Sequence, residues 1–108
     1  MNEKVVINEV TNEGCVVHVY FNEMTGLNIS FGLSAYIVTR YVPDVLQSYS
    51  DELQMPVVQL TKKQTDRLFN ALHVVNDPKK GHVLIELEQN IDESGYTEWA
   101  SKLRESCI

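Results

Sequence analysis

A proline in the middle of one long amphipathic stretch constrains this fold more than any other residue. Residues 36–53 read YIVTRYVPDVLQSYSDEL, with Pro43 near the centre. A proline inside a helix removes one backbone hydrogen bond and costs about 3 kcal/mol or more. Apolar side chains nevertheless keep the spacing of one helix face on both sides of it: Val38, Tyr41, Val42, Val45, Leu46, Tyr49 and Leu53. The pattern predicts helical backbone on both sides of Pro43, with a bend or break at residues 41–44.

A strand over residues 35–42 is the competing interpretation. β-Branched and aromatic residues dominate this segment, and such residues favour strands. A strand, however, would have no reason to share the helical register of residues 45–53. Ser34 is also a suitable N-cap for a helix that follows it. The helix is therefore favoured, and the strand stays open as the alternative.

Three strands are expected before this segment. Residues 3–10 and 15–21 are short and rich in β-branched side chains, and residues 27–31 alternate apolar and polar side chains. Asn and Gly residues between them are typical of turns. Together they predict a three-stranded antiparallel meander in which Val17, Val19, Ile29 and Phe31 face the core.

The second half of the chain adds shorter signals. Residues 55–60 are expected to be extended, and residues 76–81 to form a turn. A helix over 62–74 is predicted to start at Thr61, because Thr at the N-cap with Gln64 three residues later is a capping-box pattern. Residues 82–88 alternate as a strand with Glu86 and Glu88 facing out, and a last helix presents one stripe on its inner face: Tyr96, Trp99, Ala100 and Leu103.

These elements predict one α+β domain over residues 1–108 with the order β-β-β-α-β-α-β-α. A mainly antiparallel sheet, made of the N-terminal meander and the later strands, is expected to be packed on one face by about three helices. The predicted core consists of the following side chains: Val17, Val19, Ile29, Phe31, Leu46, Leu68, Phe69, Leu72, Val83, Ile85, Trp99 and Leu103.

The sequence carries no pattern typical of an active site, a metal site or a cofactor site. The three histidines have no His or Cys partner at helical ligand spacing, and Cys15 and Cys107 do not form a CxxC pair. No GxSxG motif and no phosphate-binding glycine loop occurs. We therefore expect a protein that is not an enzyme, with no metal and no cofactor. Cys15 is expected to be a small buried hydrophobic residue.

Charge is the most distinctive property of the chain. The formal net charge is -6, and residues 82–108 alone carry six acids against two basic residues. Direct nucleic-acid binding is not expected of such a protein, because it depends on neutralising phosphates. The sequence shows neither a signal peptide nor a membrane-spanning run, so a cytoplasmic location and no membrane association are expected.

A set of acidic residues near the C-terminus is the candidate partner-binding surface: Glu86, Glu88, Asp92, Glu93 and Glu98. Favourable interaction with a helix N-terminus is enough to explain Asp92 and Glu93. The functional hypothesis is a protein-binding module, most concretely a small acidic inhibitor or immunity-type protein. Its partner would have a basic surface, as a nuclease or another nucleic-acid-binding protein does. The alternatives are a small-molecule-binding regulatory domain, with its pocket between the sheet and the bent helix, and a homodimeric structural subunit.

Overall fold

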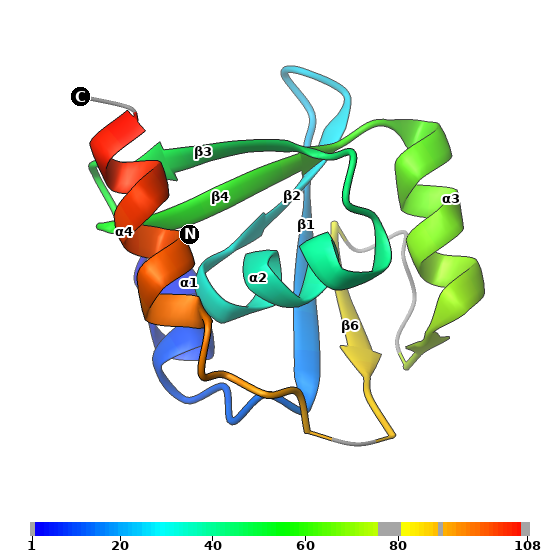
Figure 1. Cartoon of the computed structure of the whole chain (residues 1–108). Helices are drawn as coiled ribbons and strands as arrows, with labels where there is room; N and C mark the ends of the chain where they lie inside the picture. The colour runs from blue at the N-terminus through cyan, green and yellow to red at the C-terminus, as the bar shows by residue number, and fades with distance from the viewer. Residues whose placement is uncertain (1, 76–80, 89, 107–108) are drawn as a thin grey trace.

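A six-stranded antiparallel sheet organises the computed structural model, which describes residues 2–75, 81–88 and 90–106 (Figure 1). The strand order is β3-β4-β2-β1-β6-β5, and each neighbouring pair is antiparallel. The predicted fold class, α+β with an antiparallel sheet, is confirmed. In chain order the elements are α1 (Asn2–Val10), β1 (Val16–Asn22), β2 (Leu27–Phe31), α2 (Gly32–Tyr41), β3 (Leu46–Ser50), β4 (Met55–Leu60), α3 (Lys62–Ala71), β5 (His73–Val74), β6 (His82–Glu86) and α4 (Tyr96–Ser106).

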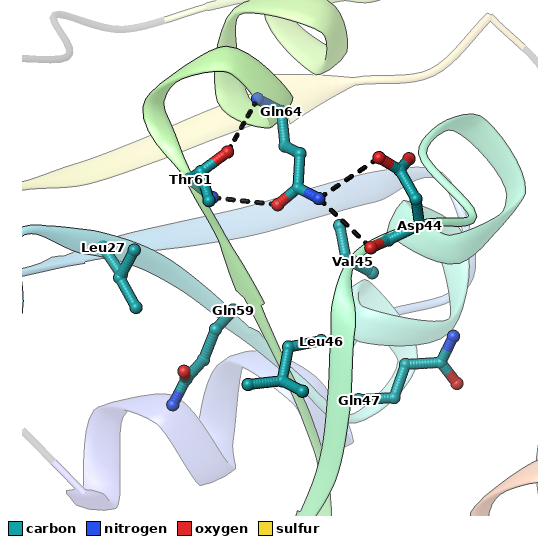
Figure 2. A pocket seen from close by; sticks show the side chains of 8 residues that line it. All are labelled: Leu27, Asp44, Val45, Leu46, Gln47, Gln59, Thr61 and Gln64. Carbon is teal, nitrogen blue, oxygen red and sulfur yellow. Dashed lines mark hydrogen bonds between the residues drawn. The ribbon is translucent and has the colours of Figure 1, made fainter.

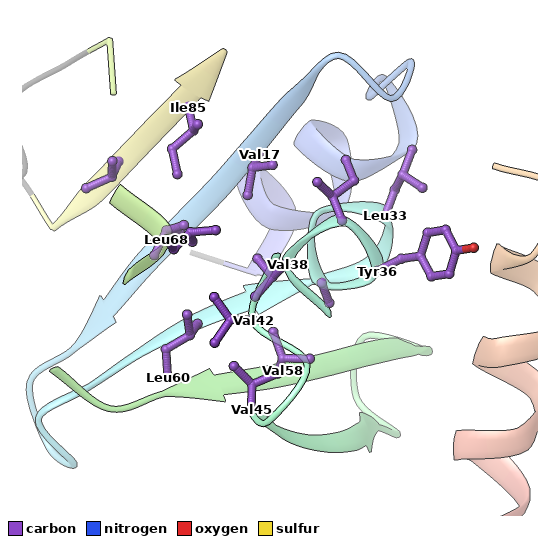
Figure 3. Close-up of a cluster of buried hydrophobic side chains, with 14 residues drawn as sticks. Val17, Leu33, Tyr36, Val38, Val42, Val45, Val58, Leu60, Leu68 and Ile85 are labelled. Carbon is purple, nitrogen blue, oxygen red and sulfur yellow. The ribbon is translucent and has the colours of Figure 1, made fainter. Parts of the chain in front are cut away.

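The two faces of the sheet bury different clusters. Val17 and Val19 of β1 belong to the larger cluster, which fills the space under α2 and includes residues of β4 and β6 (Figure 3). Half-buried side chains of α3 and α4 pack against the same cluster. Tyr20 points to the opposite face, because neighbouring side chains in a strand alternate. There it forms a second cluster with Val5 of α1 and Met55 of β4. Three helices therefore cover one face, and α1 covers part of the other.

The prediction of a strand over residues 3–10 is wrong, because this segment forms helix α1. Val5 and Glu9 lie one helical turn apart and are both buried. Val5 packs on Tyr20, while Glu9 reaches the start of α2. Contacts with the rest of the fold outweigh the β propensity of the segment. The N-terminal meander is thus a hairpin of β1 and β2 preceded by a helix.

The helix before Pro43 is confirmed, and the helix after it is wrong. Helix α2 ends at Tyr41, with Val42 N–H still donating to the Val38 carbonyl at 2.8 Å. Strand β3 begins at Leu46 after a short turn. The chain leaves the helix at Pro43, as a proline favours. The shared register across it reflects burial of Val42 and Val45 in one cluster, not one continuous helix.

Short-range sequence patterns correctly predicted most of the helices and strands in the second half of the chain. β4, α3, β6 and α4 all occur where they were expected. Thr61 and Gln64 form the predicted capping box, in which each side chain bonds the other's backbone N–H. The helix ends at Ala71 instead of residue 74, and the short strand β5 was not predicted. The expected turn at residues 76–81 lies outside the described residues except for Gly81.

Of the predicted core residues, five are buried, six are half-buried, and only Leu46 is exposed. Val17, Val19, Leu68, Val83 and Ile85 are buried, and several others are half-buried: Ile29, Phe31, Phe69, Leu72, Trp99 and Leu103. Leu46 is 64% exposed, because it lies at the start of an edge strand and not on a helix.

Ser30 is fully buried in the middle of β2, although the alternating pattern placed it outside. Its hydroxyl donates to the His18 carbonyl at 2.9 Å, which satisfies the buried oxygen.

None of the helices in the described part of the chain is long and apolar enough to cross a membrane.

Candidate functional site

Two segments far apart in the sequence run side by side at one end of the sheet. Val16 of β1 pairs with Glu86 of β6. Beyond this pair, the Cys15 carbonyl accepts from the Leu87 N–H, and the Gly14 carbonyl accepts from the Ile91 N–H. These bonds fix the loop that leads from β6 towards α4 against the loop that precedes β1.

Four of the five predicted acidic residues lie on this loop or at its start. Glu86, Glu88, Asp92 and Glu93 are all exposed. The neighbouring loop contributes one more exposed carboxylate, from Glu13. We call these five residues the acidic end.

The loop is held in a tight conformation next to Gly14. Gly14 has φ +86, and a Cβ there would lie 3.0 Å from a Glu93 side-chain oxygen. Asp92 accepts from the Ser94 N–H at 2.9 Å, and this bond is the main reason why the pKa of its carboxyl is lowered. Arg40 contributes to the same shift with its positive charge.

Glu98 does not join the acidic end. It lies on α4, where it forms an exposed ion pair with Lys102 at 3.2 Å. The spacing of one helical turn explains this contact, and such pairs contribute only a few tenths of a kcal/mol, roughly 0.3–0.5. All five predicted acidic residues are therefore exposed, but Glu98 lies apart from the other four.

A surface hollow of about 460 Å³ adjoins the acidic end. Its lining combines two of the acidic side chains with aromatic and apolar ones: Tyr41, Ala71, Leu72, His73, Glu86, Leu87 and Glu88. Tyr41 is 43% exposed, so its ring is accessible. Carboxylates beside an aromatic ring suit a Lys or Arg side chain, through charge and through the ring face.

A second hollow, of about 400 Å³, lies near the start of α3 (Figure 2). Gln64 donates from its amide to Asp44 across its rim, and Arg67 holds the same carboxylate at 2.9 Å. These bonds lower the pKa of Asp44, the bond to Arg67 most strongly. Gln64 and Arg67 are therefore both already bonded to Asp44.

The space between the sheet and α2 is filled with side chains (Figure 3). Ile37, Val38 and Val42 are each fully buried there. Any small-molecule site at that location would need these side chains to move.

A pair of histidines forms a polar site that sequence reasoning missed. His18 Nδ1 and His82 Nε2 are 3.0 Å apart, a hydrogen-bond distance. The His82 ring also stacks on Tyr20, at 4.6 Å between centroids and 9° between planes. The two histidines are 64 positions apart in the sequence, and only the pairing of β1 with β6 brings them together. The alternation of side chains in each strand could be read from the sequence. Only the register of β1 with β6 shows that both histidines lie on the same face of the sheet.

Burial keeps His18 neutral. Burial and, to a smaller extent, the nearby charge of His82 together lower the pKa of His18 to about 4. Of the two facing nitrogens, His18 Nδ1 and His82 Nε2, one donates and the other accepts, and the tautomers decide which.

Glu9 forms the second polar site. Its carboxylate accepts from the Ser34 N–H at 2.9 Å and from the Ser34 hydroxyl at 2.7 Å. Ser34 lies in the first turn of α2, whose N-cap Phe31 supplies no side-chain bond. Glu9 thus caps α2 from a different helix. Burial raises the pKa of Glu9, although the bonds from Ser34 and Asn12 act against that shift.

Within the described residues, no group of three or more His, Cys, Asp or Glu side chains could hold a metal ion. Cys15 carries a free thiol and is half-buried instead of fully buried.

Comparison with known proteins finds no match to this chain among protein-family models, curated proteins or solved structures.

Proposed function

We propose that this chain is a non-enzymatic protein-binding module that neutralises a basic partner through its acidic end. The observation that carries the proposal is the gathering of five exposed carboxylates by the hydrogen-bonded loops at 13–16 and 86–93. Like charges held close together raise the local potential and attract a positively charged surface. A nuclease or another nucleic-acid-binding protein offers such a surface.

The hollow beside Glu86 and Glu88 supports the same function. It gives the acidic end a concave part with an accessible tyrosine, and aromatic side chains are enriched at interface anchors. The net charge of -6 favours a basic partner and opposes self-association of two like-charged copies.

Three baits test the proposal in a lysate of the native host. The wild-type chain is compared with Glu86→Lys/Glu88→Lys/Glu93→Lys and with a matched control, Glu23→Lys/Asp66→Lys/Glu105→Lys. The control reverses three exposed acids away from the acidic end, so both variants change the net charge equally. We expect a basic protein to be captured by the wild type and by the control, and lost with the acidic-end variant.

Association kinetics of the purified pair then test the mechanism. Electrostatic steering is screened over about 8–10 Å at physiological ionic strength, so the on-rate should fall steeply as salt rises. The acidic-end variant should lower the on-rate far more than it lowers stability, because exposed charges contribute little to folding. An on-rate independent of salt, or equal losses in both triple variants, would remove the acidic end from the function.

A further inference from the structure

The described side chains of helix α1, residues 5–10, hold it on the sheet by few contacts. Its buried anchor is the smaller cluster, in which Val5 packs with Tyr20 and Met55. Asn8 donates from its side chain to the Tyr20 hydroxyl at 2.9 Å, and Glu9 bonds Ser34. The larger cluster lies on the opposite face of the sheet and does not include α1. A segment with such a small anchor can open locally while the main core stays folded.

Tyr20 connects this anchor to the histidine pair. On one side it contacts α1 through Val5 and Asn8. On the other side its ring stacks on His82, which in turn lies 3.0 Å from His18. A displacement of the histidines therefore acts directly on the residue that anchors α1.

The number of protons on the pair decides whether it can stay together. One added proton can occupy an outer ring nitrogen and leave the N–H···N bond intact. A second proton places N–H groups on both facing nitrogens and two positive charges next to each other. We propose that the His18–His82 pair is an acid-sensitive latch, and that its full protonation breaks the bond between the rings, displaces Tyr20 and releases α1 from the sheet.

The neighbouring groups do not supply this response themselves. Among the described side chains, the titratable groups on the elements around the pair are Glu9 of α1, Tyr20 of β1, Glu86 of β6 and His73 of β5. β2 and β4 present only uncharged side chains to this region. Glu86 and His73 are both exposed and pair with each other, beyond Leu84, the cross-strand partner of His18. Glu9 acts in the opposite direction, because its raised pKa favours the docked, protonated state as pH falls.

The size of the effect follows from proton linkage. In the released state His18 would regain its ordinary pKa of 6.5, compared with about 4 in the docked state. The linkage of His18 alone then favours release by about 30-fold at pH 5, and by roughly 150-fold at pH 4, relative to pH 7.5, and Glu9 reduces both factors.

Native-state hydrogen exchange followed by NMR tests the latch. We expect the protection of α1 amides, corrected for intrinsic exchange, to fall between pH 7.5 and pH 5, by at most about 30-fold because Glu9 opposes His18. Amides of α3 should keep their protection. In His18→Phe, which keeps a ring but cannot titrate, the protection of α1 should no longer fall over this range, because only the opposite effect of Glu9 remains. His73→Phe is the matched control and should behave as the wild type, because His73 is exposed.

Three results would overturn the proposal. They are constant protection of α1 amides in the wild type, the same fall in α1 protection in His18→Phe, or a simultaneous loss of protection in α1 and α3. His82→Gln is a second variant in case His18→Phe does not fold. A glutamine can accept a hydrogen bond from protonated His18, so the fall should shrink well below that of the wild type. An unchanged fall in His82→Gln would also contradict the latch.

Discussion

Single residues decide how the separate parts of this fold are joined, and Glu9 is the clearest case. A helix leaves its first N–H groups without intrahelical partners, and α2 has no capping side chain of its own. Glu9 supplies the missing acceptor from α1, next to the positive end of the α2 dipole. Gly32 permits this approach, since it has φ +55 and a Cβ there would lie 3.2 Å from Glu9.

Replacing Glu9 should destabilise the protein far more than replacing an exposed acid. In Glu9→Ala, the buried Ser34 N–H and hydroxyl lose their acceptor, which costs about 1–3 kcal/mol. Urea unfolding followed by circular dichroism measures the change. Glu13→Ala is the control, because Glu13 is exposed, and it should cost less than about 0.5 kcal/mol. Equal and small losses in both variants would show that Glu9 does not cap α2.

At the scale of elements, three aromatic rings attach α4 to the rest of the molecule. Tyr36 of α2 contacts Tyr96 and Trp99 of α4, with ring centroids 5.8 and 5.4 Å apart. Trp99 also donates from its indole N–H to the Gln47 side chain of β3 at 3.1 Å. α4 contains no fully buried residue, so these contacts are its main attachment.

Truncating Trp99 should therefore release α4 preferentially. Because the side chain is half-buried, we expect Trp99→Ala to cost about 2–3 kcal/mol, less than a fully buried aromatic residue would. Thermal unfolding measures the loss, and hydrogen exchange should show α4 amides more affected than those of β1. Tyr41→Ala is a control with a comparable ring that is 43% exposed. If α4 amides keep their protection in Trp99→Ala, other contacts hold the helix.

The elements that the sequence predicted correctly are those defined by neighbouring residues. Thr61 and Gln64 are three positions apart, so their capping box could be read directly from the chain. Glu86 and Glu88 were correctly expected to be exposed, because the alternation of apolar and polar side chains in residues 82–88 is also a pattern of neighbouring residues. Ser30, His18 and Glu9 were misread or missed, because their burial depends on partners 12 or more positions away. Nothing in the sequence indicated that α1 covers the second face, where the rings of His18 and His82 lie. Ser30, in contrast, lies on the opposite face beside Val58 of the larger cluster.

At the scale of the whole molecule, two buried groups give the stability opposite dependences on pH. The pKa of His18 is lowered to about 4, so its contribution is complete above 6.5 and is lost as pH falls towards 4. A shift of this size corresponds to on the order of 3 kcal/mol. The pKa of Glu9 is raised, so its contribution is complete below 4.5 and is lost as pH rises through the folded-state value. Between pH 4.5 and pH 6.5, the changes that His18 and Glu9 cause in the free energy of unfolding therefore partly cancel.

Separating the two slopes is possible with two neutral replacements. In Glu9→Gln, the free energy of unfolding should fall more steeply than in the wild type as pH drops from 6.5 to 4.5, since only the His18 slope remains. In His18→Phe, it should instead rise, or fall less, over the same range. Urea unfolding at a series of pH values measures both profiles, with His73→Phe as the control that should follow the wild type. If all the profiles are parallel, neither buried group controls stability, and exposed carboxylates account for the acid response of the protein.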